Sequence, residues 1–264
     1  MTTEPAADFE SRRFQTAAAH YLAGRPPYPD ALIARTAELV GLTRSDRLLD
    51  LGCGPGQVSR AFAPFAREVV AMDPESAMLD IARLTNASIP NVTVVQGRSD
   101  QLDAGHGRFK AVVIARAFHW MDRDQTLRTL DGLVEPGGAV VLMGEELQKV
   151  PENARMEEFR QLDRTWSADD RTHPIFQARE RPHLSVLLAS PFSQLEQIEV
   201  IQRHPLSYQA LADRLLSFSS TSRARLGAKA DEMLEDLRGK VEAWEAQGPL
   251  EEVLASQALI ARRP

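Results

Sequence analysis

The chain has 264 residues, of which 43% are hydrophobic and 26% charged, proportions typical of a globular protein that can bury a substantial core. Its net charge of −6 argues against a nucleic-acid-binding surface, and it shows no apolar run long enough for a signal peptide or a membrane span. Cys53 is the single cysteine, which leaves no intrachain disulfide and favours a reducing, cytoplasmic location.

The first 40 residues predict two short helices separated by a proline-rich break. Helix-forming residues extend from 13 to 22, and the segment from Pro26 to Pro29 ends that helix, because proline lacks a backbone donor. Asp30 is a candidate N-cap for a helix over residues 31–40, which Gly41 would end. We therefore expect residues 1–40 to form an N-terminal helical segment.

A glycine-rich turn follows the first predicted strand, residues 48–51. Glycines stand at three of five consecutive positions: Gly52, Gly54 and Gly56. In an open α/β sheet such a turn lies where nucleotide-like ligands bind, and glycine lets the backbone approach the ligand. A dinucleotide fingerprint would need a third glycine where Ser59 stands, and Asp50 would repel a phosphate. A cationic or amine-bearing ligand suits the turn better; an ordinary glycine-rich turn is the alternative.

Two further predicted strands end in polar residues. The apolar run from residue 68 ends at Asp73, 23 positions after Asp50, where a carboxylate can accept both hydroxyls of a ribose. A helix is expected from Ser76 onward. Residues 91–97 have strand composition and lead to Ser99 and Asp100, each of which taken singly fits a solvated loop equally well.

The fourth predicted strand, residues 109–115, is uniformly apolar at its centre, as a sheet covered on both faces requires. His119 follows in the next loop and is a candidate general base or substrate hydrogen-bonding group, since imidazole titrates near neutrality. A histidine that packs or caps the loop is the alternative. Trp120 fits a pocket wall better than a reactive group.

The remaining elements complete an alternation of strands and helices. We expect a helix over 124–133, a turn at Pro136-Gly137-Gly138, strands over 139–143 and 195–201, helices over 208–216 and 223–244, and a last strand over 254–262. This alternation predicts an α/β fold with a parallel sheet. Residues 145–191 interrupt it with four prolines and several aromatics, which predicts a mostly helical cap insertion over the carboxyl edge of the sheet. A surface excursion or an oligomer contact is the alternative.

Residues 50–56 resemble D-x-G-x-G-x-G, the first motif of the class I S-adenosylmethionine-dependent methyltransferases, and Asp73 and residues 99–100 match that family's next segments. The resemblance implies a Rossmann-like, seven-stranded, mostly parallel sheet with an antiparallel last strand, helices on both faces, and S-adenosylmethionine as cofactor. In that family an acidic residue holds the cofactor's ammonium group and a second one binds its ribose. The implied cofactor contacts here are Asp50, Gly52, Cys53, Gly54, Gly56, Asp73, Pro74, Met78, Ser99, Asp100 and Ala115. Core packing is the alternative for Met78.

The segment from Ala115 to Trp120 resembles the A-x-A-F-H-W stretch of the small-molecule branch of that family, which is methyltransferase type 11-like and similar to trans-aconitate methyltransferase-like proteins. In this branch the loop lies beside the reactive methyl group. The resemblance implies that His119 is the catalytic residue and that Arg116, His119 and Trp120 bind the substrate.

The N-terminal residues Phe14, Tyr21 and Arg25 to Pro29 resemble a stretch that precedes the first motif in the same branch. The resemblance implies that this stretch folds over the cofactor. Arg25 would pair with the methionyl carboxylate, because its planar guanidinium donates two parallel hydrogen bonds, and Tyr21 would add a hydroxyl or an aromatic wall. A solvated arm is the alternative.

We therefore expect three parts: the N-terminal segment 1–40, a cofactor-binding methyltransferase domain over 41–144 and 192–264, and the cap over 145–191. The expected function is transfer of a methyl group to an O, N, S or C nucleophile of a small molecule, such as a natural-product intermediate or a small carboxylic acid. We expect no metal, nucleic-acid or membrane partner, and leave a homodimer open. Four residues can recognise an anionic acceptor or be merely solvated: Arg116, Arg171, His173 and His183.

Three other functions compete with methyl transfer. The same fold can bind S-adenosylmethionine and catalyse a non-methylating reaction, it can act as a binding module, or the chain can be a nicotinamide oxidoreductase. The carboxylate set disfavours a binding module, and the glycine spacing together with Asp50 disfavours the oxidoreductase. The identity of the acceptor stays open.

Overall fold

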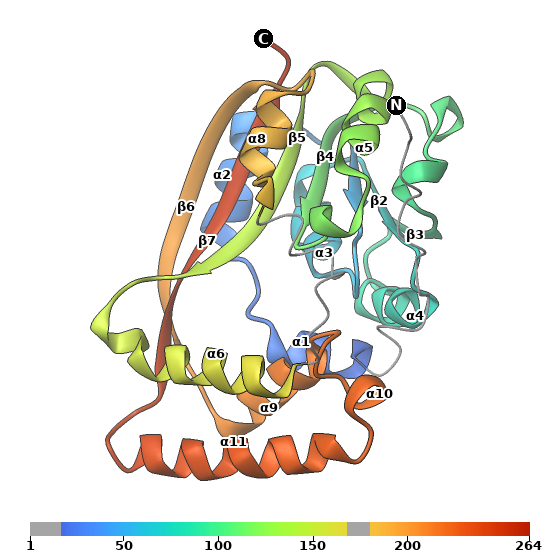
Figure 1. Ribbon diagram of the computed structural model, residues 1–264. Helices are drawn as coiled ribbons and strands as arrows, with labels where there is room; N and C mark the ends of the chain where they lie inside the picture. The colour runs from blue at the N-terminus through green and yellow to red at the C-terminus, as the bar shows by residue number, and fades with distance from the viewer. Residues whose placement is uncertain (1–16, 168–179) are drawn as a thin grey trace.

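A seven-stranded sheet forms the centre of the computed structural model, which describes residues 17–167 and 180–264 (Figure 1). The strands are β1 (Arg47–Leu51), β2 (Glu68–Asp73), β3 (Val92–Gln96), β4 (Phe109–Ala115), β5 (Val134–Leu147), β6 (Gln194–Pro205) and β7 (Glu251–Arg262). Their order is β3-β2-β1-β4-β5-β7-β6. Strands β1 to β5 pair in parallel, whereas β7 is antiparallel to β5 and β6. The predicted Rossmann-like sheet with an antiparallel last strand is confirmed.

Helices cover both faces of this sheet. On one face, Leu48 packs in a cluster with residues of α2 (Asp30–Val40) and α3 (Gln57–Phe62). On the other, Leu49 packs with residues of α5 (Arg123–Leu133) and α8 (His183–Leu188). Leu79 of α4 (Ser76–Thr85) packs against Ala71 of β2. Successive strand residues thus point to opposite, equally apolar layers, which explains why the central strands are apolar throughout.

A third layer of helices lies beyond the carboxyl ends of the parallel strands, at the bottom of Figure 1. It consists of α1 (Ala18–Gly24), α6 (Ala154–Trp166), α9 (Tyr208–Ser217), α10 (Arg223–Leu226) and α11 (Lys229–Glu245). Phe159, Leu215 and Leu237 belong to its own buried cluster, which also includes Leu147 of β5 and Leu254 of β7. We call this layer the cap. No helix in the described ranges is long and apolar enough to cross a membrane.

The cap is formed by different helices from those expected from the sequence, which placed the cap within residues 145–191. Helix α8, inside that range, packs against the sheet, whereas α9 to α11, outside it, pack with α6. Strand β5 also continues to Leu147, beyond the expected boundary at 144. The reason is tertiary: an amphipathic helix has one apolar face, and its sequence does not say which core covers that face.

Some helix ends follow local signals. Gly41 ends α2 with φ 64°, and the Asp122 carboxylate accepts a hydrogen bond from Gln125 N (2.9 Å) at the start of α5. Two expectations are corrected. The N-cap of α2 is Pro29 rather than Asp30, which becomes the first helical residue, and the helix expected over 223–244 is interrupted at Gly227, where φ is 57°. The short 3-10 turns are η1 (Ala63–Phe65), η2 (Ser99–Gln101), η3 (Ala104–His106), η4 (Phe118–Trp120) and η5 (Pro151–Asn153).

Candidate functional site

The glycine turn after β1 needs glycine for both conformation and space. Gly52, Gly54 and Gly56 have φ values of 77°, 53° and 81°, a region that side chains strain. A Cβ on Gly52 would lie 2.5 Å from Cβ of Ala117, and one on Gly56 would lie 2.3 Å from Nδ2 of Asn86. The turn therefore packs against both the loop after β4 and the end of α4.

Asp50 is fully buried at the end of β1, where Ser59 Oγ donates a hydrogen bond to its Oδ2. Its other oxygen, Oδ1, is buried and has no hydrogen-bond partner within residues 17–167 and 180–264. Burial raises the pKa of Asp50 to about 7; the Ser59 hydrogen bond opposes this shift and the Asp73 charge adds to it. Ser59 occupies the position that excluded a dinucleotide fingerprint, and the structure shows that it supports Asp50 instead.

Asp73 joins the end of β2 to the glycine turn. Its Oδ2 accepts from Gly54 N (2.8 Å) and its Oδ1 from Glu75 N (2.9 Å). Burial raises the pKa of Asp73, while the two backbone hydrogen bonds oppose the shift. The structure therefore brings together two predicted site residues, Gly54 and Asp73, that lie 19 positions apart.

Glu75 is a candidate site residue that sequence reasoning missed. Its side chain is 3% exposed, its Oε1 accepts no hydrogen bond from the described residues, and it does not cap α4 although it occupies the N-cap position. Burial and the neighbouring Asp73 raise its pKa to about 7. The sequence signal that could have identified it is a glutamate at a helix N-cap, where Ser, Thr, Asp or Asn is preferred.

The other predicted cofactor contacts lie at the same edge of the sheet. Met78 is 4% exposed in the first turn of α4, and burial raises the pKa of the Cys53 thiol. Asp100 in η2 is exposed and forms two hydrogen bonds with Arg98, of 3.0 and 2.9 Å. The remaining three, Pro74, Ser99 and Ala115, are half-buried at the ends of β2, β3 and β4.

Arg116 connects three segments at the end of β4. Its φ is 55°, and its guanidinium forms an ion pair with Glu145 of β5, donates to Pro26 O (2.9 Å) and stacks on the Tyr28 ring at 4.7 Å. Both charged side chains are 13% exposed. The charge of Arg116 is thus already matched by Glu145, so its expected role in substrate binding stays a prediction.

His119 and Trp120 lie together in η4, with ring centroids 5.1 Å apart. His183 of α8 stacks on His119 at 6.5 Å and meets Phe118 edge-on at 5.1 Å. Burial lowers the pKa of His183, and the Arg123 charge adds to the shift. The pairing of two imidazoles from positions 119 and 183 has no local sequence signal.

Arg25 and Tyr21 lie between α1 and α9. Arg25 Nε donates to Ser217 Oγ (3.1 Å), and its guanidinium stacks 4.4 Å from the Phe218 ring and 5.6 Å from the Tyr21 ring. Burial lowers the pKa of Arg25. Three residues named from the sequence lie outside the described ranges: Phe14, Arg171 and His173.

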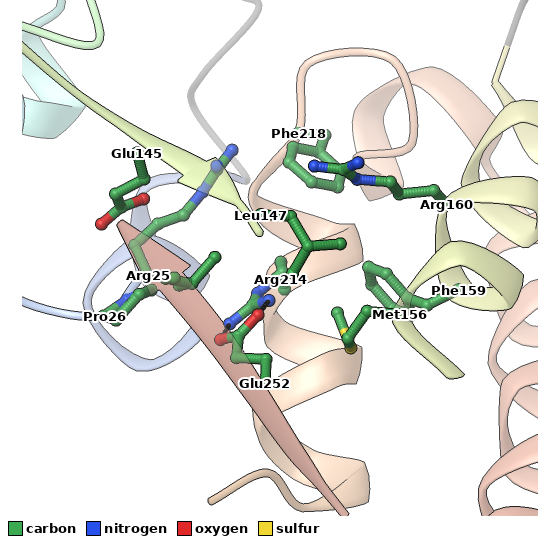
Figure 2. Close-up of a pocket in the computed structure, with 11 residues that line it drawn as sticks. Arg25, Pro26, Glu145, Leu147, Met156, Phe159, Arg160, Arg214, Phe218 and Glu252 are labelled. Carbon is green, nitrogen blue, oxygen red and sulfur yellow. Dashed lines mark hydrogen bonds and ion pairs between the residues drawn. The ribbon is translucent and has the colours of Figure 1, made fainter. Parts of the chain in front are cut away.

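A cavity of about 150 Å³ opens where the cap meets the ends of β5 and β7 (Figure 2). Its lining combines apolar and charged side chains: Arg25, Pro26, Glu145, Leu147, Met156, Phe159, Arg160, Arg214, Phe218, Glu252 and Leu254. Glu145 links it to the loop after β4 through Arg116. Within the described ranges no group of three or more His, Cys, Asp or Glu residues is arranged to hold a metal.

Comparisons with known proteins agree with this geometry. Residues 48–138 match a methyltransferase domain family. An uncharacterized methyltransferase of Mycobacterium tuberculosis is 28% identical over 229 residues, 86% of each chain. A solved structure from Anaeromyxobacter dehalogenans, provisionally assigned as a type II methyltransferase, superposes with a TM-score of 0.63 at 25% identity, over 90% of this chain and 97% of that one.

A more distant solved structure shares the fold. It is an S-adenosylmethionine-dependent methyltransferase from Geobacter sulfurreducens in complex with S-adenosylhomocysteine. The two superpose with a TM-score of 0.54 at 16% identity, over 96% of this chain and 98% of that one.

Proposed function

Because the fold, the matched domain and the similar proteins identify this chain as a class I S-adenosylmethionine-dependent methyltransferase, we propose that it methylates a nucleophile of a small molecule. The acceptor atom is an O, N, S or C atom. One observation carries the proposal most directly: the glycine turn, Asp73 and the loop containing His119 end on one edge of the sheet, beneath the cap.

The residues at this edge fit the cofactor. Asp50 Oδ1 and Glu75 Oε1 are buried acceptors without partners, and such atoms are costly unless a ligand supplies donors. An ammonium group and ribose hydroxyls are donors of this kind. Because Gly52 and Gly56 have no Cβ, Ala117 and Asn86 can pack closely against the turn.

The proposed roles follow the chain. Asp50 and the glycine turn would hold the methionyl part of the cofactor, with Tyr21 near its carboxylate, and Asp73 would bind the ribose. The adenine side would be formed by Pro74, Met78, Ser99 and Asp100, and Cys53 and Ala115 complete the walls. Arg116 and Trp120 would shape the acceptor site.

When bound, S-adenosylmethionine supplies a methyl group that is already electrophilic. The protein therefore contributes mainly alignment and exclusion of water, and alignment can lower a barrier by about 7–11 kcal/mol in the best intramolecular cases. The cap provides the cover over this edge of the sheet. His119 would orient the acceptor or take its proton where the acceptor must lose one.

The test begins with calorimetry, in which S-adenosylmethionine should bind and NAD should not. Mass spectrometry should then detect S-adenosylhomocysteine with a panel of small-molecule acceptors. Replacing His119 by Ala should lower kcat about 10²- to 10⁴-fold and leave cofactor affinity within about twofold. His106→Ala is the matched control, because His106 lies in η3 before β4, whereas His119 lies in η4 after β4.

Two results would contradict the proposal. Unchanged turnover in His119→Ala would move the catalytic role to another residue. Consumption of S-adenosylmethionine without S-adenosylhomocysteine would favour a non-methylating reaction on the same fold. The charge of −6 supports a small molecule rather than a nucleic acid as acceptor.

A further inference from the structure

The cavity between the cap and the sheet has an apolar side built from four parts of the chain. Leu147 comes from β5, Met156 and Phe159 from α6, Phe218 from the end of α9, and Leu254 from β7. Figure 2 shows the labelled apolar side chains beside the charged residues of the same cavity lining. A volume of about 150 Å³ with an apolar lining accommodates a group the size of a benzene ring.

The carboxylates in the cavity lining are already paired. Glu145 pairs with Arg116, and Glu252 accepts two hydrogen bonds of 2.6 Å from Arg214, which is itself 12% exposed. Arg160 lies in a more exposed position and pairs with Glu157. These pairs leave no carboxylate of the lining available to Arg25.

Arg25 is therefore the unmatched charge of the cavity. Among the described residues no carboxylate lies within 4.0 Å of its guanidinium, and Ser217 Oγ and two aromatic faces are its contacts. The charges of Glu145 and Asp163 act on Arg25 from a greater distance, but Glu145 pairs with Arg116 and Asp163 accepts from Ser167 Oγ (3.2 Å). A buried guanidinium that forms no ion pair with the described residues is a site for an incoming carboxylate, which it can bind with two parallel hydrogen bonds.

We propose that this cavity binds the methyl acceptor, and that the acceptor is an aromatic carboxylic acid whose carboxylate is held by Arg25. The inference rests on the proposed methyltransferase function. The ring would lie among Phe159, Phe218 and Met156, since aromatic and thioether groups pack well against a ring.

The carboxylate is an anchor rather than the methylated group, because pairing with a guanidinium withdraws the charge that a nucleophile needs. A hydroxyl or amino group elsewhere on the ring is the nucleophile. For a hydroxyl, the bond between sulfur and the methyl carbon breaks with its electron pair left on sulfur, and an oxygen–carbon bond forms. The hydroxyl proton passes to water.

Two ligands could supply the carboxylate that pairs with Arg25: the acceptor and the methionyl end of the cofactor. The cavity lining favours the acceptor: it contains residues of α6, α9 and β7 and none of the glycine turn. The aromatic partner of the guanidinium, Phe218, also belongs to the cap side.

The experiment is calorimetry with three probes: 4-hydroxybenzoate, its methyl ester and S-adenosylhomocysteine. The wild-type protein should bind the acid at least tenfold more tightly than the ester. Arg25→Gln should weaken binding of the acid about 10- to 100-fold and leave S-adenosylhomocysteine within about twofold. Arg25→Lys should recover part of the affinity for the acid. Arg164→Gln on α6 is the control, because it removes the same charge outside the cavity lining, from a guanidinium that hydrogen-bonds to Gln161.

Three outcomes overturn the proposal: no binding of the acid by the wild type, equal binding of acid and ester, or a loss in Arg25→Gln that falls on S-adenosylhomocysteine. The last assigns Arg25 to the methionyl carboxylate. Thermal unfolding of each variant verifies that it is folded before titration. Because S-adenosylhomocysteine binding by the wild type tests the proposed function separately, failure of the acid does not count against methyl transfer itself.

Discussion

Buried carboxylates are the clearest residue-level feature of the sheet edge at which β1 and β2 end. Asp50 and Glu75 each carry a buried oxygen without a hydrogen-bond partner, and burial raises the pKa of both to about 7. A native protein rarely keeps such atoms unless they serve a ligand or store strain. Asp50 is itself a predicted cofactor contact, and Glu75 directly follows another, Pro74, so both carboxylates lie where the proposed function places the cofactor.

The raised pKa of Glu75 predicts how stability depends on pH. Its folded value of about 7 exceeds the ordinary 4.5, so the folded state binds the proton more tightly. Stability is therefore highest below about pH 4.5 for this group and falls as the pH rises through about 7. Glu75→Gln should remove this loss and raise the free energy of unfolding at pH 8 by about 1–2 kcal/mol, after allowance for solvent screening.

Urea unfolding of the two proteins at pH 5 and pH 8 measures this effect. The wild type should lose more stability between the two pH values than Glu75→Gln does. A Glu75→Gln variant with the same pH dependence as the wild type would show that Glu75 ionises freely in the folded state.

The ion pair between Arg116 and Glu145 makes a second residue-scale prediction. Both side chains are 13% exposed, and removing one member leaves the other as an uncompensated buried charge. Glu145→Gln should therefore lower the free energy of unfolding by about 3 kcal/mol. Glu196→Gln is the control, because Glu196 pairs with Arg262 while 42% exposed and should cost less than about 1 kcal/mol. Equal losses in a denaturant titration would mean that the Glu145 pair is solvated.

At the scale of elements, the close contact between α1 and α9 positions the N-terminal segment. His20 Nδ1 lies 2.6 Å from Asp213 Oδ1, and Arg214 Nε donates to Gly24 O (3.0 Å). Gly24 permits this approach, since a Cβ there would lie 2.5 Å from Arg214 N. The contact brings Arg25 next to α9, where its Nε donates to Ser217 Oγ, 192 positions further along the chain.

Gly24→Ala should therefore separate the two helices. We expect a loss of about 1–3 kcal/mol in the free energy of unfolding, because backbone atoms must move to admit the methyl group. Gly239→Ala in α11 is the control: nothing lies within 4 Å of its Cβ position, and alanine favours a helix by about 1 kcal/mol. A Gly24→Ala protein as stable as the wild type would show that α1 is only loosely held against α9.

At the scale of the whole molecule, the cap has a core distinct from the two layers on the sheet. Leu147 of β5 and Leu254 of β7 belong to this core, so these two strands extend from the sheet into the cap. A separate cluster can open separately, as local unfolding units do. Under the proposed function, such opening would admit an acceptor while the sheet stays folded.

Truncating a residue of each core tests this division. Leu237→Ala in the cap should lower stability by about 2–5 kcal/mol and raise hydrogen exchange in α6, α9 and α11 while β1 and β4 stay protected. Leu127→Ala, in the cluster between α5 and the sheet, should raise exchange in the sheet itself. Equal exchange in cap and sheet for both variants, measured by mass spectrometry, would mean that the protein opens as one unit.

The sequence by itself determined the features that depend on neighbouring residues. Three closely spaced glycines require a turn with positive φ, and the βα alternation predicts the parallel sheet and the edge at which Asp50 and Asp73 meet. These inferences succeed because backbone geometry and strand order restrict where contiguous residues can lie.

Only the tertiary structure decided which distant side chains meet. It paired Ser59 with Asp50, His183 with His119, and Arg116 with Glu145, and it placed α9 to α11 rather than α8 in the cap. An amphipathic helix or a charged side chain carries no record of its partner, because any apolar layer or opposite charge would satisfy it locally. The packing of the whole chain determines which of these partners is used. It therefore also determines which side chains line the cavity together with Arg25.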